Sequence, residues 1–330
     1  MRQPLPATLN RDDSTALKGI AILLMIMHHV LIKDYFIDPV ACLRSNIVIL
    51  RLMVLGKVCV GLFMFVTAYG YALQKKRDWL YSFSHIKRLL LRYWALLVIF
   101  IALGFLAGNH PDSITVLLNL FGLSSAYSCA NWYVYFYIYA MLVLPLLSWL
   151  VDRYRVWPVL LSIVVCGLAS YLLKSDNLWL KVVRECLFYT PVLAIGRYLA
   201  QSGMAVIRHR FSTIELVLAL VLALAAGCVS RDIYGFCTFT VIIPVMAWTM
   251  VALLRQQCLH NLRAVLIKLG QLSLYMWFVH SVFFSSMTRS LFQQSSLWPK
   301  NLILVYLVVF GISLLVSAGL ARVDKMITQK

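Results

Sequence analysis

Two histidines near opposite ends of the chain are the residues whose positions most suggest chemistry. His29 lies in a long apolar run near the N-terminus, and His280 lies in another near the C-terminus. Ionisable side chains inside hydrocarbon are costly and usually face a cavity or a partner. Imidazole exchanges a proton near neutral pH, so either ring can serve as a catalytic base. The alternative for each is an interhelical hydrogen bond without chemistry.

Lys18 shares a helical face with His29. His29 lies eleven positions after Lys18, which places it roughly 16 Å deeper at about 1.5 Å per residue. Eleven steps of about 100° also bring His29 back to within about 20° of Lys18, whereas His28 lies about 80° away. A cation and a deep imidazole on one face favour a catalytic role for His29. His28 is expected to be structural.

Four further side chains have both a functional and a plain interpretation. Lys57, in the second apolar run, either neutralises a bound anion or pairs with a carboxylate. Arg88 and Arg92 are one helical turn apart, which suits a phosphate, but their basic cluster also suits anchoring at an anionic leaflet. Trp132 opens an aromatic run that an interfacial belt explains, although the indole could stack on a sugar.

These side chains must be positioned by helices in a membrane. The chain has 330 residues, of which 62% are hydrophobic and 13% charged, far more apolar than soluble domains. Apolar runs long enough to cross a bilayer recur along it. They predict an all-α integral membrane bundle of about ten transmembrane helices, at about 17–36, 47–73, 89–107, 132–151, 156–173, 178–199, 213–229, 233–254, 265–284 and 302–321. We expect a single membrane domain over residues 1–330, with no extra soluble domain.

The positive charge of +18 follows the membrane topology and does not indicate nucleic acid. With ten spans, most Lys and Arg residues fall in termini and loops on one side. The positive-inside rule makes that side, and therefore both termini, cytoplasmic. The eight cysteines show no CxxC pair and no metal-ligand spacing, so no metal site is expected.

Several segments resemble the acyltransferase-3 family of membrane enzymes, which O-acylate glycans, lipids or antibiotics. LKGIAILLMIMHHV places Lys18 and His29 where the family has arginine, ten residues and histidine; lysine keeps the charge but loses the bidentate fork. LGQLSLYMWFVHSVFF resembles a late Ser-x-Tyr-x-x-aromatic-x-His element, with Ser273, Tyr275, Phe278 and His280. Three further segments match in order: GKVCVGLFMFVTAYGYAL, HIKRLLLRYW and NWYVYFYIYAMLVLPLL.

The resemblance implies an O-acyltransferase of the bacterial cytoplasmic membrane that uses acetyl-CoA or another acyl-CoA as co-substrate. His29 and His280 would be catalytic, with His29 either a general base or a transient acyl carrier. The coenzyme A phosphates would lie near Lys18, Arg88 and Arg92. The acceptor would be a hydroxyl of a cell-surface or lipid-linked saccharide, with Lys57, Trp132 and Tyr275 expected to contact substrate.

Two other classes of protein remain in competition with this interpretation. A transporter of an anionic or glycan-linked solute would line its path with Lys57, His29 and His280. Transporters often contain inverted repeats or helices broken by Gly and Pro, and neither is clear in this sequence. A purely structural or receptor-like membrane protein explains the spans but leaves the deep ionisable residues without a purpose.

Overall fold

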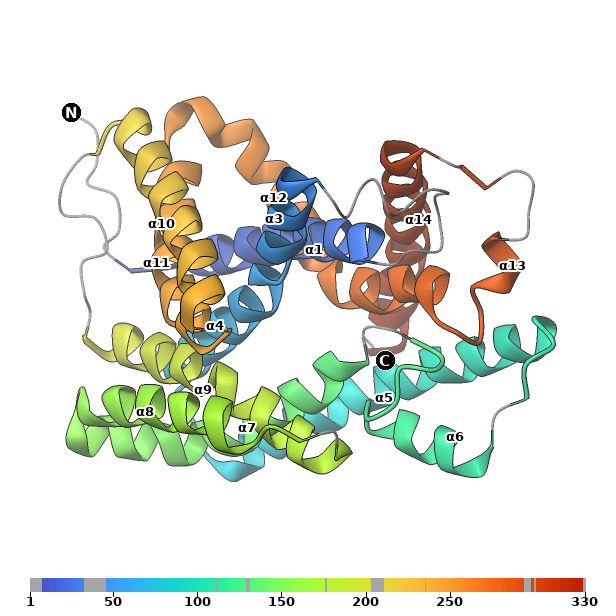
Figure 1. Cartoon of the computed structure of the whole chain (residues 1–330), viewed down its shortest axis with the longest axis horizontal. Helices are drawn as coiled ribbons and strands as arrows, with labels where there is room; N and C mark the ends of the chain where they lie inside the picture. The colour runs from blue at the N-terminus through green and yellow to red at the C-terminus, as the bar shows by residue number, and fades with distance from the viewer. Residues whose placement is uncertain are drawn as a thin grey trace. The chain divides into compact units, whose positions relative to one another are not determined.

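The chain folds into helices. The structure, a computed structural model, describes residues 8–32, 46–110, 112–128, 131–175, 177–202, 211–234, 236–293, 298–299 and 301–328. Within these ranges it contains helices and turns and no strand (Figure 1). The expected all-α fold class is therefore confirmed for the described residues.

Every predicted span coincides with helical structure. The helices that correspond to the spans are α1 Arg11–Ile32, α3 Ile47–Gly56 with α4 Val58–Ala72, α5 Trp79–Leu106, α7 Trp132–Tyr154, α8 Trp157–Leu172, α9 Leu178–Ser202, α10 Thr213–Tyr234, α11 Phe236–Leu254, α12 His260–Val279 with η3 His280–Phe284, and α14 Leu302–Thr328. Three short elements lie between them: α6 Ser113–Leu120, η2 Gln257–Leu259 and α13 Ser290–Gln293. Residues 33–36, the predicted end of the first span, lie outside the described ranges.

Six helical segments in the described part of the chain are long and apolar enough to cross a membrane. They are Arg11–Ile32, Ile47–Ala72, Trp79–Leu106, Trp132–Tyr154, Gln257–Phe284 and Leu302–Ile327. Three shorter apolar helices are Trp157–Leu172, Thr213–Val229 and Thr240–Leu254. The remaining one, α9, is long but carries Lys181, Arg184, Glu185 and Arg197. The protein is therefore a multi-pass membrane protein with six candidate spans by length and composition.

Two helices begin earlier than the hydropathy of the sequence predicts, because polar residues cap them. Asn10 and Asp13 form a reciprocal capping box at the start of α1, with N–H to side-chain oxygen distances of 3.0 and 2.8 Å. Asp78 accepts a hydrogen bond from the Tyr81 N–H at 2.8 Å before the first full turn of α5. Hydropathy marks only the apolar stretch of a helix, so it misses such amphipathic extensions.

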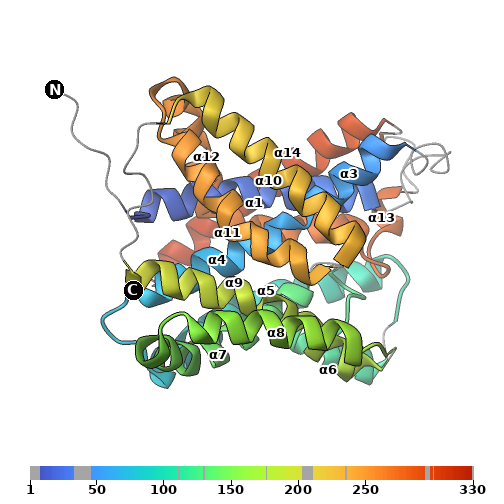
Figure 2. The same ribbon diagram turned by 60° about the vertical axis from the view of Figure 1, so that its left-hand side comes forward.

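The chain separates into two compact units, each built from three segments. The first unit comprises 1–21, 58–83 and 139–270. Within it α9 packs against α4 and α8, and α11 packs against α10, α9, α4 and α8 (Figures 1 and 2). On α9 the fully buried Arg197 is held by Asp152 of α7 at 2.6 Å and by the Ser148 hydroxyl at 3.0 Å.

The second unit comprises 22–57, 84–138 and 271–330. It contains the C-terminal part of α1, then α3, most of α5, α6, the end of α12, η3, α13 and α14, and α14 packs against η3. Each unit takes residues from the N-terminal and the C-terminal half of the chain. The expectation of one membrane domain stays a prediction.

Candidate active site

His29 and His280 lie side by side in the second unit. His29 occupies the last turn of α1, and His280 opens η3, which continues directly from α12. The distance from His29 Nδ1 to His280 Nε2 is 2.8 Å, and the two ring planes are 15° apart. Both imidazoles are buried, with 5% and 0% of their surface exposed. The structure thus joins the two histidines that the sequence singled out.

The hydrogen-bond partners determine which ring nitrogens carry the protons. His280 Nδ1 lies 2.8 Å from the Met276 carbonyl oxygen, which can only accept, so Nδ1 must be the protonated nitrogen. In the neutral ring His280 Nε2 is then an acceptor, and His29 Nδ1–H donates to it. Neutral His29 therefore carries its lone pair on Nε2. That atom can take a proton from a substrate or attack an acyl group.

The neighbouring His28 has a structural contact. Its Nδ1–H donates to the Met53 carbonyl of α3 at 2.8 Å. Gly56, the last residue of α3, approaches the same side chain so closely that an added Cβ would lie 2.6 Å from His28 Cβ. Any larger residue at position 56 would therefore push α3 away from α1. His28 fastens α3 to α1 one residue before His29, in keeping with the role expected for it.

Lys57 lies at an interruption of the second candidate span. The helical segment Ile47–Ala72 is divided into α3 and α4, and Lys57 occupies the turn between them. Its side chain is half-buried. An interrupted helix directs backbone and side-chain groups toward a cavity more often than toward lipid. Lys57 also follows Gly56 directly, so it lies close along the chain to the contact between α3 and His28.

The segment η3 is anchored by the connection before α7. The hydroxyl groups of Ser281 and Ser128 are hydrogen-bonded, and the Met287 N–H donates to the Ala126 carbonyl at 3.1 Å. Asn109 donates to the Met287 carbonyl at 2.8 Å. These bonds hold η3 and the residues that follow it, and so restrict the position of the His280 ring.

Aromatic rings gather on α7 and on α12 close to His280. Trp132 is half-buried, and its ring meets Trp277 edge-on with centroids 5.3 Å apart. Tyr133 lies 4.3 Å from the same ring, and Trp277 precedes His280 by one helical turn. Phe284 forms a further apolar wall, with its centroid 6.1 Å from that of His29. Trp132 thus belongs to the cluster around η3, and its contact with a sugar stays a prediction.

A buried polar network next to this cluster was not foreseen from the sequence. The Tyr93 hydroxyl donates to the Asn119 carbonyl at 2.5 Å, and the Asn131 amide donates to the Asn119 side-chain oxygen at 2.8 Å. The Asn131 side-chain oxygen and the Tyr127 hydroxyl are buried without a hydrogen-bond partner among the described residues. Such groups suit a bound polar molecule. The connection 108–131 is partly apolar in sequence, and no pattern in it marks Asn119, Tyr127 or Asn131.

One end of α6 shows how that network is positioned. Asp112 caps α6, and the Thr115 backbone N–H, which donates to the carboxylate, lowers the pKa of Asp112 from its ordinary value. The Trp94 indole N–H donates to the Leu120 carbonyl at 2.8 Å, just after α6. Together these bonds fix Asn119, near the end of α6, against α5.

Arg88 and Arg92 have different partners in the structure. Arg92 is paired with Asp324 of α14, with an Nη2 to Oδ2 distance of 2.9 Å, and the Tyr275 phenol faces both groups. Arg88 is exposed, and its Nε–H donates to the Ser84 carbonyl at 3.3 Å. Tyr275 therefore belongs to the arginine and aspartate cluster of the second unit. Phosphate binding by these arginines stays a prediction.

Lys18 lies on α1 two turns after the helix begins and is half-buried. It belongs to the first unit, whereas His29 belongs to the second. Their common helix is confirmed by the bounds of α1. The described residues contain no group of three His, Cys, Asp or Glu side chains arranged to hold a metal ion.

The family of the chain follows from its sequence over nearly the full length. The acyltransferase-3 family model, described as an acyltransferase domain, matches residues 12–322. The match includes both histidines, the interrupted span and most of α14. No curated protein and no solved structure matches the chain. This chain is a multi-pass helical membrane protein with a buried histidine pair. Because the family model matches residues 12–322, the chain belongs to the acyltransferase-3 family.

Proposed function

We propose that this protein transfers an acetyl group from cytoplasmic acetyl-CoA to a hydroxyl of a cell-surface or lipid-linked saccharide. Membership of the acyltransferase-3 family supports acyl transfer. The buried hydrogen bond from His29 to His280 is the observation that supports this pair as the active site. The proposal includes ten transmembrane spans with both termini in the cytoplasm of a bacterium, which agrees with the distribution of basic residues.

His29 Nε2 is the proposed catalytic base. It would take the proton of the acceptor hydroxyl as the hydroxyl oxygen attacks the thioester carbonyl. This attack would form the new carbon–oxygen bond, and the tetrahedral intermediate would then collapse by restoring the carbonyl and breaking the carbon–sulfur bond. The departing thiolate would receive the proton from His29, so that the products are an acylated hydroxyl and coenzyme A. General-base catalysis of this kind contributes roughly 10² to 10⁴-fold to the rate.

His280 is proposed to position His29 and to stabilise it when charged. Its Nε2 accepts the His29 Nδ1–H, which leaves Nε2 of His29 as the basic nitrogen. When His29 gains a proton, the same hydrogen bond becomes charge-assisted and therefore stronger. The alternative in which His29 carries the acyl group on Nε2 uses the same nitrogen. The hydrogen bond thus serves either chemistry.

Lys57 and the aromatic cluster are proposed to contact the substrates. A cationic side chain at the α3–α4 interruption can stabilise the oxyanion of the tetrahedral intermediate. Trp132 and its aromatic neighbours offer apolar faces on which a sugar ring can stack. The unpartnered Asn131 oxygen and Tyr127 hydroxyl would hydrogen-bond to sugar hydroxyl groups.

The test of this function follows an acetyl label from its thioester to its product. Membranes containing the protein are incubated with acetyl-CoA labelled in the acetyl group, and the glycan and lipid-linked saccharide fractions are collected. The proposal predicts base-labile label in one of these fractions together with release of coenzyme A. Solute flux without consumption of acetyl-CoA would contradict it and would favour a transporter, for which the interrupted span at Lys57 is the supporting feature.

A further inference from the structure

A basic cavity of about 620 Å³ lies in the first unit, where the chain passes from α11 through η2 into α12. Its size falls within the range of about 300 to 1,000 Å³ typical of ligand pockets. The lining residues are Asn10, Leu254, Arg255, Gln256, Gln257, Cys258, His260, Asn261 and Arg263. Two of them are arginines, one is histidine, four carry amide side chains, and none is acidic.

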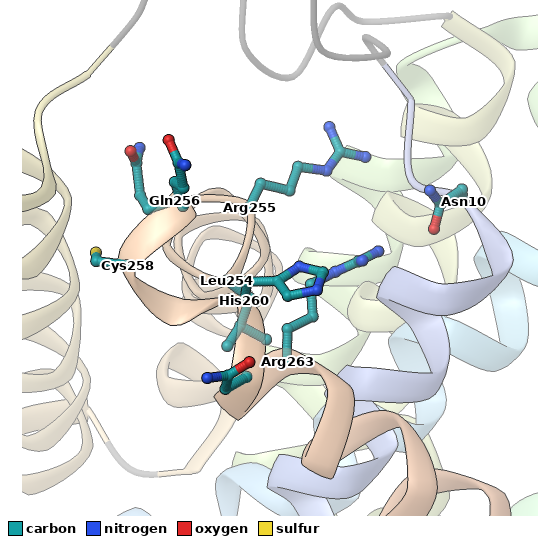
Figure 3. Close-up of a pocket in the computed structure, with 9 residues that line it drawn as sticks. Asn10, Leu254, Arg255, Gln256, Cys258, His260 and Arg263 are labelled. Atoms are coloured by element: carbon teal, nitrogen blue, oxygen red, sulfur yellow. The ribbon is translucent and has the colours of Figure 1, made fainter.

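Both arginines of this cavity form ion pairs with the buried Asp13. Asp13, which is 1% exposed, pairs with Arg255 Nη2 at 2.5 Å and with Arg263 Nη2 at 3.1 Å. Arg255 Nη2 also donates to the Thr8 carbonyl at 2.8 Å, and its side chain is only 4% exposed. Two guanidinium groups facing one carboxylate leave an excess of one positive charge. Figure 3 shows Arg255 and Arg263 both extending toward Asn10, with the His260 ring beside them.

Arg263 retains donors that the protein does not use. Its one ion pair within the described residues is to Asp13, and its buried Nε–H has no hydrogen-bond partner there. A guanidinium group has five N–H donors in a planar fork that matches the oxygen atoms of a phosphate. An unsatisfied buried donor in a basic cavity is costly unless a ligand completes it.

The N-terminus of α12 adds to the attraction for an anion. This helix of 20 residues begins at His260, and His260, Asn261 and Arg263 of its first turn line the cavity. The unpaired N–H groups and the macrodipole at a helix N-terminus favour phosphate. A helix N-terminus, two arginines and amide donors converge here from one short stretch of sequence. The plain function of fastening α1 to α12 explains Asp13 but leaves the cavity and the Arg263 donor unexplained.

We infer that this cavity binds the phosphate groups of the nucleotide portion of acyl-CoA. The inference rests on the proposed function, which requires a coenzyme A thioester on the cytoplasmic side. It moves the phosphate site from Arg88 and Arg92 to Arg255 and Arg263. Both helices that start beside the cavity continue along the chain to the histidine pair: α1 carries His29 in its last turn, and η3 with His280 follows α12.

Two substitutions test the cavity without removing the buried Asp13–Arg255 pair. Arg263→Gln removes the guanidinium group that has unused donors. Asn261→Asp places a carboxylate in the lining of the cavity, where it stabilises the N-terminus of α12 and repels phosphate. The matched control is Arg153→Gln, because Arg153 is an exposed arginine of the same unit. Melting temperature and gel-filtration profile establish that each full-length variant is folded.

The experiment measures equilibrium binding of coenzyme A, adenosine 3′,5′-bisphosphate and acetyl-pantetheine to the purified protein in phosphatidylcholine nanodiscs. We expect Arg263→Gln and Asn261→Asp to raise the Kd of both phosphorylated ligands about tenfold or more. The Kd of acetyl-pantetheine should not change. The control should bind like the unaltered protein. The affinity for phosphorylated ligands should also fall as the salt concentration rises, and this fall should be less steep in Arg263→Gln than in the unaltered protein.

Three outcomes would overturn the inference. Unchanged affinity of the folded cavity variants for coenzyme A would place the phosphates elsewhere while leaving acyl transfer intact. Failure of adenosine bisphosphate to bind the unaltered protein would exclude nucleotide recognition. Competition by phosphatidylglycerol nanodiscs with no effect of Arg263→Gln on coenzyme A would identify a lipid headgroup site. His29→Ala should retain binding, so loss of transfer in that variant tests the proposed function separately.

Discussion

At the scale of single residues, the proton on each imidazole is set by a backbone carbonyl. The Met276 oxygen fixes His280 Nδ1–H, which makes His280 Nε2 an acceptor and places the His29 proton on Nδ1. The Met276 carbonyl thereby determines, through two successive hydrogen bonds, that Nε2 is the basic nitrogen of His29. A lone buried histidine could adopt either tautomer. In the pair, the hydrogen bond to His280 fixes the tautomer of His29 before a substrate binds.

Replacing His280 should reduce the rate of transfer and leave the binding of substrates almost unchanged. We expect His280→Ala to lower kcat by about 10 to 100-fold, because His29 loses the acceptor that stabilises its charged form. His280→Gln should recover part of the rate, since the glutamine amide oxygen can accept the same N–H. Steady-state kinetics of both variants, with circular dichroism to verify folding, provide the comparison. Equal rates in His280→Ala and the unaltered protein would show that the pair has no catalytic part.

The fully buried Arg197 depends on one carboxylate. Asp152→Ala should lower the free energy of unfolding by about 1 to 2 kcal/mol, because it leaves the buried cation without this counter-ion, although Asp152 itself is 44% exposed and solvent weakens the pair. Arg197→Met combined with Asp152→Ala should restore much of the loss. Melting temperatures of the two variants in one detergent test this. A double variant no more stable than Asp152→Ala would mean that the charge of Arg197 is not the cause.

The predicted residues that the structure places at junctions are those whose type is unusual for their surroundings. A histidine or lysine in an apolar run stands out, and His29, His280 and Lys57 all lie at structural junctions of the second unit. Arg88 and Arg92 show the limit of spacing arguments. One-turn separation places two side chains on one face, but Arg92 pairs with Asp324, more than two hundred residues away, whereas Arg88 donates to the Ser84 carbonyl of its own helix. Only the tertiary structure supplies that partner.

At the scale of helices, glycine permits close approach of α1 and α12 within the first unit. A Cβ on Gly270 would collide with the Thr15 carbonyl, and one on Gly19 would collide with the Leu266 carbonyl. Each backbone therefore packs directly against the other helix. The same close approach holds the beginnings of both helices beside the basic cavity.

Enlarging Gly270 should destabilise the protein. Gly270→Ala forces the two backbones apart, which costs about 1 to 3 kcal/mol in overpacked cores and should lower the melting temperature by several degrees. Gly311→Ala on α14 is the matched control, because a Cβ there would meet nothing within 4 Å. It should leave the melting temperature equal or slightly higher. A larger drop for Gly311→Ala than for Gly270→Ala would refute the packing argument.

A second glycine should affect activity more than stability. Gly56→Ala displaces α3 from His28, the residue before His29, and we expect transfer to fall about tenfold because small displacements of a catalytic group are costly. Gly70→Ala, where a Cβ would again meet nothing within 4 Å, provides the control. The measurement is the initial rate of coenzyme A release. Full activity in Gly56→Ala would mean that the α3 contact does not position His29.

Helix position was predictable here, and helix interruption was not. Long apolar runs located every helix that corresponds to a predicted span. No proline marks the break at Lys57 in the sequence. The capping box at Asn10 and Asp13 extends α1 beyond its apolar stretch. The basic residues from 255 to 263 were interpreted only as a guide to topology. Their convergence on a cavity depends on Asp13, which lies far away in the sequence.

At the scale of the whole molecule, the number of spans is the main quantity still to be measured. Six candidate spans and ten proposed spans both place the termini on one side, so terminal tags do not distinguish them. The difference lies in α8 to α11. With ten spans, Arg153 faces the cytoplasm and Lys174 faces the other side of the membrane. If α8 does not cross, both residues lie on one side.

Cysteine labelling can distinguish these topologies. Arg153→Cys and Lys174→Cys are introduced separately into a chain that carries Cys258→Ser, because Cys258 is exposed. In intact cells an impermeant thiol reagent should label position 174 and not position 153, since the exposed side chains lie at opposite ends of α8. Labelling of both positions, or of neither until the cells are opened, would exclude the ten-span topology.

The most direct test of the account compares two adjacent histidines in one assay. Release of coenzyme A from acetyl-CoA, dependent on an acceptor saccharide, is measured for His29→Ala and His28→Ala at matched expression and verified folding. The account predicts a loss of roughly 10² to 10⁴-fold for His29→Ala and a much smaller loss for His28→Ala, whose hydrogen bond to Met53 is structural. Comparable activity in the two variants, or a larger loss for His28→Ala, would contradict the assignment of His29 as the catalytic base.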